Sequence, residues 1–193
     1  MAFLIPLFLL VLTLSTPAMA HTSEGVANGF LSGLLHPVLG LDHVTAMVAV
    51  GILGAFLGRP AVWILPVVFP LVMALGGVLG LLGLNIPLIE AGIAVSSIVL
   101  GLMILFALKP PLWIAALIVA AFAIFHGHAH GTELPDASNA LAYSAGFVIS
   151  TGLLHLAGIL IGELLRWPTG KLIARGVGGV IALAGVGFLT GFV

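Results

Sequence analysis

The chain has 193 residues, of which 62% are hydrophobic and only 6% carry a charged side chain. Charged residues make up about a quarter of a typical water-soluble domain, so this composition excludes one. Five Lys and Arg against six Asp and Glu give a formal net charge of -1, which leaves no basic surface for nucleic acid. The absence of cysteine excludes disulfides and thiolate metal ligands. The composition therefore predicts an all-α, polytopic membrane protein whose partner is lipid.

The first twenty residues have the form of a secretory signal peptide. An apolar stretch runs over residues 3–14, and Ala18-Met19-Ala20 offers the small-x-small pattern of a cleavage site. Cleavage would leave His21 as the mature N-terminus and residues 21–193 as the transmembrane domain. A retained extra helix is the alternative reading.

The mature chain divides at its charged residues, prolines and glycines into six apolar stretches. Each is close to the roughly 20 residues that a helix needs to cross a bilayer core about 30 Å thick. Glycine pairs such as Gly76-Gly77 and Gly178-Gly179 predict close packing between helices. The predicted spans cover residues 36–57, 61–83, 87–108, 111–131, 139–165 and 172–192.

The charged residues predict the orientation of these spans, because Lys and Arg near helix ends are retained on the cytoplasmic side. All the cations lie in or beside the first, third and fifth connections, whereas Glu24, Glu133 and Asp136 fall on the other side. This split predicts both ends outside the cytoplasm. Two halves of three spans each would then have opposite orientations, as in inverted-repeat transporters.

The first predicted span contains His36-Pro-Val-Leu-Gly-Leu-Asp42-His43. Pro37 suits the first position of a helix, and in a continuous helix His36 and His43 would lie about 10 Å apart along the axis. That distance is too long for one ion and indicates successive sites along a path, unless the segment from Pro37 to Gly40 is unwound. Asp42 would bind metal directly or fix the tautomer of a histidine.

A second group of polar residues closes the fourth predicted span. His126 and His130 are four residues apart, a chelating spacing on a helix, and Glu133 continues the same stripe. His128 would point away from that face. A solvated histidine-rich loop with incidental metal affinity is the alternative.

Four further residues are candidate metal ligands that are less well supported or that need partners from another helix. Glu90 lies one turn inside the third predicted span, at the same exterior end as the histidines, and could converge with them. Met47, one turn after His43, could be a soft ligand but also a packing residue. His155 could form a deeper site or be a hydrogen-bonded structural histidine, and His21 could bind metal at the mature N-terminus.

Imidazole and carboxylate together suit divalent nickel, cobalt, zinc, copper or iron, and ligand type does not separate these ions. A permeating ion must also leave its site, which requires modest affinity. The ion is therefore expected as cargo, and no prosthetic group is expected.

The segment His36-Pro-x-x-Gly-x-Asp42-His43-x-x-x-Met47 resembles the HupE/UreJ family of hydrogenase- and urease-associated nickel permeases. The resemblance extends over nearly the whole chain. It implies uptake of Ni(II) from periplasm to cytoplasm across the inner membrane of a bacterium, and the ligand chemistry also admits Co(II) or Zn(II) as cargo. The ion would supply hydrogenase or urease maturation, with nickel chaperones as downstream partners. His36, Asp42 and His43 match the motif, whereas the other candidates rest on the physical argument.

Two other function classes fit parts of the pattern. An intramembrane zinc hydrolase could use these histidines with Ser32, but it needs a closed three-ligand site with an activated water. A non-transporting assembly factor could present His21 and residues 126–130 to a periplasmic enzyme. Such a factor would tolerate loss of Asp42 and Glu90, and a permease would not.

Overall fold

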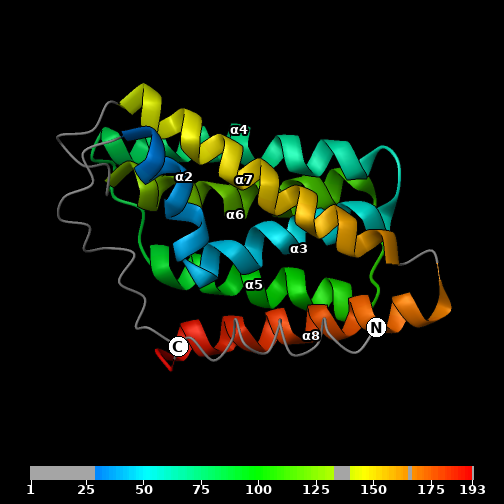
Figure 1. Cartoon of the computed structure of the whole chain (residues 1–193). Coiled ribbons are helices and arrows are strands. Elements are labelled where there is room, and N and C mark those ends of the chain that lie inside the picture. Colours follow the sequence, from blue (N-terminus) through cyan, green and yellow to red (C-terminus); the bar gives the residue numbers. More distant parts are fainter. Residues whose placement is uncertain (1–28, 133–139, 165–166, 193) are drawn as a thin grey trace.

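The computed structural model describes residues 29–132, 140–164 and 167–192. Within these ranges the chain forms helices and no strand, so the all-α prediction is confirmed for this part of the protein (Figure 1). The predicted signal peptide, residues 1–20, lies outside the described residues. The helices are α2 (Gly29–Leu39), α3 (Leu41–Leu57), α4 (Ala61–Leu81), α5 (Ile89–Leu105), α6 (Leu112–Thr132), α7 (Ala140–Glu163) and α8 (Pro168–Thr190).

Four of the described helices, α4, α6, α7 and α8, are long and apolar enough to cross a membrane. The bent pair of α2 and α3 qualifies only as a unit, which raises the number of candidate spans to five. Helix α5 has 17 residues, so its length of about 26 Å is slightly less than the hydrocarbon core. The protein is thus a multi-pass membrane protein.

The first predicted span differs most from the structure. The reading of residues 36–57 as one continuous helix with Pro37 in its first turn is wrong. Helix α2 begins at Gly29 and carries Pro37 near its end, and α2 and α3 meet at 78°. Proline lacks the N–H that would continue the helical hydrogen bonds, and three residues later Gly40 is extended, with φ -90° and ψ 108°. Non-helical backbone of this kind occurs in membranes where it lines a protein interior.

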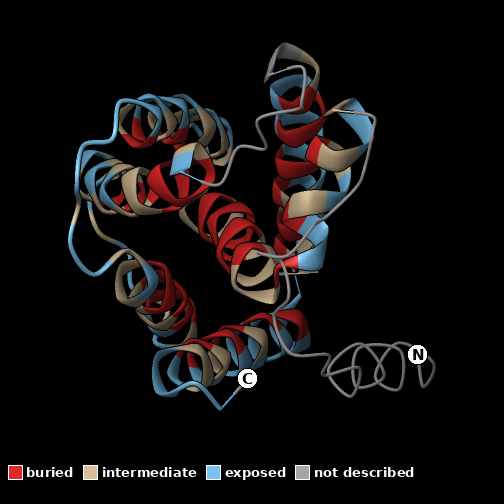
Figure 2. Cartoon of the chain, turned by 90° about the vertical axis from the view of Figure 1, so that its left-hand side faces the viewer, coloured by how far each residue is buried: buried red, intermediate tan, exposed pale blue. Residues whose placement is uncertain are grey.

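Helix α3 lies at the centre of the bundle and packs against each of the other six described helices. Around it, α4 lies beside α6, α5 beside α8, and α2 and α3 beside α7 (Figure 1). Figure 2 shows the buried residues turned toward the middle of the bundle and the exposed residues turned outward. The outward surface includes large apolar side chains such as Trp63, Leu71, Trp113, Leu153 and Leu183. Such a surface fits a lipid environment.

Glycines allow α4 and α6 to approach closely, as the sequence predicted. A Cβ atom on Gly76 would lie 2.5 Å from the carbonyl oxygen of Ile124, and one on Gly80 would lie 2.5 Å from that of His128. Real Cβ contacts are not this short, so only glycine permits the observed packing. The last turns of α6, which carry several candidate histidines, are therefore held firmly against α4.

Helix α8 begins at Pro168 rather than at the predicted residue 172. Proline is well suited to a first helical position, and the nearby cations do not end the helix because long basic side chains can extend toward water. The Nε of Arg175 donates to the carbonyl oxygen of Leu105 at 2.7 Å. Lys109 Nζ lies 5.4 Å from the ring centroid of Phe56. These cations therefore gather near the C-terminal ends of α3 and α5.

Candidate metal site

Four imidazole rings from three helices converge at one end of the bundle. His36 comes from α2, His43 from α3, and His126 and His130 from α6. The ring centroid of His130 lies 4.8 Å from that of His36 and 4.5 Å from that of His43. The centroid of His43 lies 5.0 Å from that of His126. We call these four side chains the imidazole cluster.

The break at Gly40 brings the two histidines of the first motif together. Their ring centroids are 6.2 Å apart, whereas a continuous helix would separate the residues by about 10 Å along its axis. The bend turns the end of α2 toward the start of α3. The motif therefore contributes both rings to one cluster, and the alternative with an unwound segment is the one that the structure adopts.

Asp42 orients the imidazole of His43. Its Oδ1 lies 2.8 Å from Nδ1 of the ring and 2.9 Å from the backbone nitrogen of the same residue. A carboxylate only accepts hydrogen bonds, so Nδ1–H donates and Nε2 retains its lone pair. That Nε2 atom is buried and has no hydrogen-bond partner among the described residues. Asp42 thus leaves an unprotonated nitrogen of His43 turned to the interior, where it could accept a metal ion.

Ser96 on α5 likewise orients the imidazole of His126. The Ser96 hydroxyl donates to the carbonyl oxygen of Ile93 at 2.6 Å and lies 3.0 Å from Nε2 of His126. Because its single hydrogen is used, the hydroxyl accepts from Nε2–H, and Nδ1 keeps the lone pair. Nδ1 of His126 is buried without a hydrogen-bond partner in the described part of the chain. The neighbouring rings of His43 and His126 therefore each have a fixed tautomer with one unprotonated nitrogen.

The spacing of these rings suits a divalent ion. A ligating imidazole nitrogen lies ~2.1 Å from such an ion, so two ligating rings have centroids roughly 4.5–6.5 Å apart. The closest pairs of the imidazole cluster fall in this range. Nevertheless, within residues 29–132, 140–164 and 167–192, no three His, Asp or Glu side chains are already arranged around one point as a metal site. The rings would need to rotate to hold an ion with three donors.

Helix ends also favour a cation here. His36 lies in the last turn of α2, and His130 lies in the last turn of α6. The C-terminal end of a helix carries a partial negative charge, which attracts cations within about one turn. The carboxylate of Asp42 adds a full negative charge beside His43. The electrostatics of the cluster are thus suited to a positive ion.

Aromatic rings surround the cluster. Phe147 on α7 has its centroid 4.4 Å from that of His130, and Tyr143 lies 6.0 Å from His36. Phe69 on α4 lies 5.5 Å from His126. These rings lower the local polarity around the imidazoles and so strengthen electrostatic interactions with any ion that enters.

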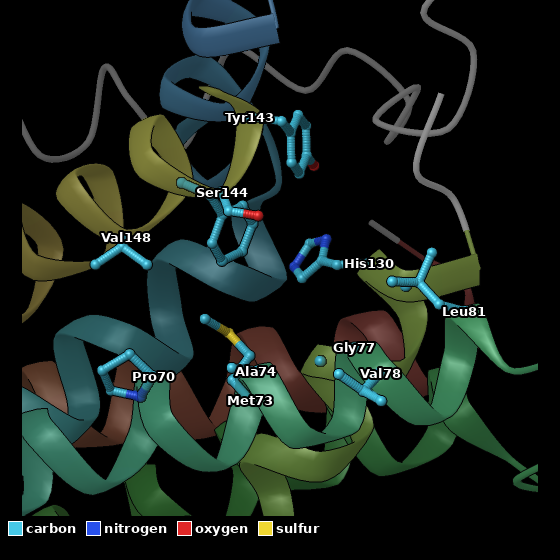
Figure 3. Close-up of a pocket in the computed structure, with 13 residues that line it drawn as sticks. Pro70, Met73, Ala74, Gly77, Val78, Leu81, His130, Tyr143, Ser144 and Val148 are labelled. Atoms are coloured by element: carbon cyan, nitrogen blue, oxygen red, sulfur yellow. The ribbon is translucent and has the colours of Figure 1, made fainter. Parts of the chain in front are cut away.

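A pocket of about 280 Å³ leads to the cluster between α4, α6 and α7. Its walls are mostly apolar and include Met73, Gly77, Tyr143 and Phe147, with His130 as the cluster member that reaches it. Figure 3 shows the His130 ring between the α4 side chains and Tyr143. An ion or water molecule in this pocket would meet His130 first.

The other predicted residues lie in different surroundings. Glu90 is exposed in the first turn of α5, so it is not buried with the imidazoles. His128 points away from the cluster, as predicted, and its Nε2 lies 2.6 Å from the carbonyl oxygen of Leu84. Met47 is fully buried among core residues of α3. Glu133 and His21 lie outside the described residues.

His155 lies deeper in the bundle, where its ring centroid is 5.5 Å from that of Phe69.

Sequence reasoning missed the supporting residues Ser96, Phe69 and Tyr143. Two signals were available for them: Ser96-Ser97 is a polar pair in an apolar helix, and Tyr143 is the only tyrosine in the chain.

Comparisons with known proteins identify the family of the chain. The family model described as HupE / UreJ protein matches residues 9–188. Protein HupE from Rhizobium leguminosarum bv. viciae is 48% identical over 179 residues, which cover 92% of this chain and 94% of that protein. No solved structure matches the chain. The family match covers most of the sequence, including every member of the imidazole cluster, and the chain belongs to the HupE/UreJ family.

Proposed function

We propose that this protein is a permease that carries a divalent transition-metal ion, Ni(II) in the first place, from the periplasm to the cytoplasm. Its cargo would supply the maturation of hydrogenase or urease through downstream nickel chaperones. Family membership supports the accessory nickel-transport role. Co(II) and Zn(II) share the same ligand chemistry and are the natural competitors.

One observation carries this proposal. His43 and His126 each keep a buried ring nitrogen without a hydrogen-bond partner among the described residues, and Asp42 and Ser96 fix the tautomers that leave these nitrogens as acceptors. A buried polar atom without a partner destabilises a fold, so its presence in a native structure calls for a functional explanation. Ionisable residues within membrane helices characteristically mark ion pathways.

The loose arrangement of the donors favours transport over permanent binding. A structural metal site holds its ion with a closed set of preoriented ligands, and the described residues contain no such set. An ion in the cluster would be bound by rings that must rotate to reach it. This lowers affinity and allows release, as conduction requires.

The proposed topology has six spans, a cleaved signal peptide and both ends in the periplasm, within the inner membrane of a bacterium. The most extensive helix pairings support a division into two halves. The two halves correspond when α2–α3 is matched with α6, α4 with α7, and α5 with α8. Under this match, the pairing of α4 with α6 corresponds to the pairing of α7 with α2–α3. The pairing of α5 with α8 corresponds to itself. Such a relationship is expected for halves of opposite orientation.

The proposal is tested by radioactive nickel accumulation in cells that express the full chain, with cobalt, zinc and copper as competitors. His43→Ala should abolish accumulation at submicromolar nickel. His128→Ala is the matched control, because it removes a buried imidazole that lies outside the cluster. Equal accumulation in cells with and without the inserted protein would refute the permease function.

A further inference from the structure

We propose a second, inner ion-binding station at His155 on α7, an inference that rests on the proposed permease function. The side chain of His155 is only 2% exposed, and neither ring nitrogen has a hydrogen-bond partner among the described residues. Thr151, one helical turn earlier, is fully buried, and its hydroxyl also lacks a partner in that part of the chain. Two orphaned polar side chains thus lie on one face of α7.

A structural histidine would look different. His128 is also buried, and its Nδ1 also lacks a hydrogen-bond partner among the described residues, but its Nε2 lies within hydrogen-bond distance of the Leu84 carbonyl oxygen and links α6 to the segment after α4. No comparable hydrogen bond from His155 to another described residue exists. Burying an imidazole without a hydrogen-bond partner is costly, so its presence here indicates a ligand that the ring binds transiently.

Phe69 links this station to the imidazole cluster. Its ring is fully buried on α4 and lies 5.5 Å from the centroids of both His126 and His155. The same aromatic ring is therefore a neighbour of both the imidazole cluster and the inner histidine. An ion at His126 and an ion at His155 would each lie close to the Phe69 ring.

Helix α7 extends from the imidazole cluster to the inner station. Phe147, Thr151 and His155 follow each other at intervals of four residues and are all buried. Phe147 contacts His130 of the cluster, and His155 lies eight residues further, about 12 Å along the helix axis. The inner station is therefore a separate site below the cluster, suited to a partly dehydrated divalent transition-metal ion held by imidazole nitrogen.

The test uses the purified full chain, with equilibrium dialysis against radioactive Ni(II) and nickel influx into proteoliposomes. His155→Leu should lower influx at least ~10-fold and remove one bound ion per protein, while the ion at the imidazole cluster remains. Thr151→Val should lower influx by a smaller factor. Ser150→Ala, a buried hydroxyl on the same helix, is the matched control and should leave both readings unchanged.

His155→Gln keeps a polar side chain of similar size and tests the station if the leucine variant does not fold. Influx and ion count equal to wild type in the folded histidine variants would overturn the inner station. Failure of the permease function itself would be distinct, because the wild-type protein would then show no influx.

Discussion

Oδ1 of Asp42 accepts hydrogen bonds from both the ring and the backbone of His43. It lies 2.8 Å from Nδ1 of the ring and 2.9 Å from the backbone nitrogen. Adjacent residues are thus joined twice at the first turn of α3. The arrangement fixes which nitrogen of His43 can bind a metal ion. Asp42 is thus a positioning residue that also contributes negative charge.

Asp42→Asn should reduce nickel uptake about 10–100-fold, the usual effect of removing the carboxylate partner of a metal-binding histidine. The amide retains the size of the carboxylate but not its charge, and its NH2 group can face Nδ1 and favour the wrong tautomer. Uptake at several nickel concentrations, normalised to the amount of inserted protein, measures the effect. Uptake equal to wild type would exclude a role for the carboxylate.

Gly40→Ala should impair uptake although it adds only one methyl group. A Cβ at this position would lie 2.9 Å from both Oδ1 of Asp42 and Nδ1 of His43, so it would disturb their hydrogen bond. Gly152→Ala is the control, because a Cβ there meets no atom within 4 Å. Parallel uptake assays should show a loss only in the first variant. Equal activity of both variants would contradict the close contact at Gly40.

Ser96→Ala should weaken uptake by about 10-fold, because His126 loses the acceptor that holds its Nε2–H. The adjacent Ser97→Ala variant is the matched control, since the Ser97 hydroxyl lies 2.9 Å from that of Thr45 and not beside a cluster histidine. The comparison measures nickel uptake in membranes with equal protein content. A larger loss in the Ser97 variant would reverse the assigned roles.

Gly127→Ala should destabilise the bundle by about 1–3 kcal/mol through overpacking. Its Cβ would collide with the backbone of Met73 on α4. Gly176→Ala in α8 meets no atom within 4 Å and should be neutral or slightly stabilising because alanine favours helix. Thermal unfolding of the purified variants in detergent measures the difference, and equal unfolding temperatures would argue against tight packing of α4 on α6.

The sequence was sufficient to predict most helix positions and the histidines that now lie together. Apolar stretches bounded by prolines and charged residues predicted the helical segments, because these features are local in the sequence. The four-residue spacing of His126 and His130 required only a helix to place them on one face. These inferences did not depend on how helices pack.

The remaining features depend on packing between distant segments. The sequence left open whether Gly40 was unwound, and only the 78° bend decides that His36 and His43 share a cluster. Glu90 is exposed because of how α5 begins, which no spacing rule gives. Ser96 becomes informative only when α5 lies beside α6 and its hydroxyl meets His126.

Nickel influx into proteoliposomes that contain only the purified full chain shows directly whether the imidazole cluster conducts the ion. We predict saturable influx of radioactive Ni(II) in the wild-type protein and loss of that influx in His43→Ala, with His128→Ala retaining it. Influx in His43→Ala equal to that of the wild type would contradict the claim that the imidazole cluster conducts the ion.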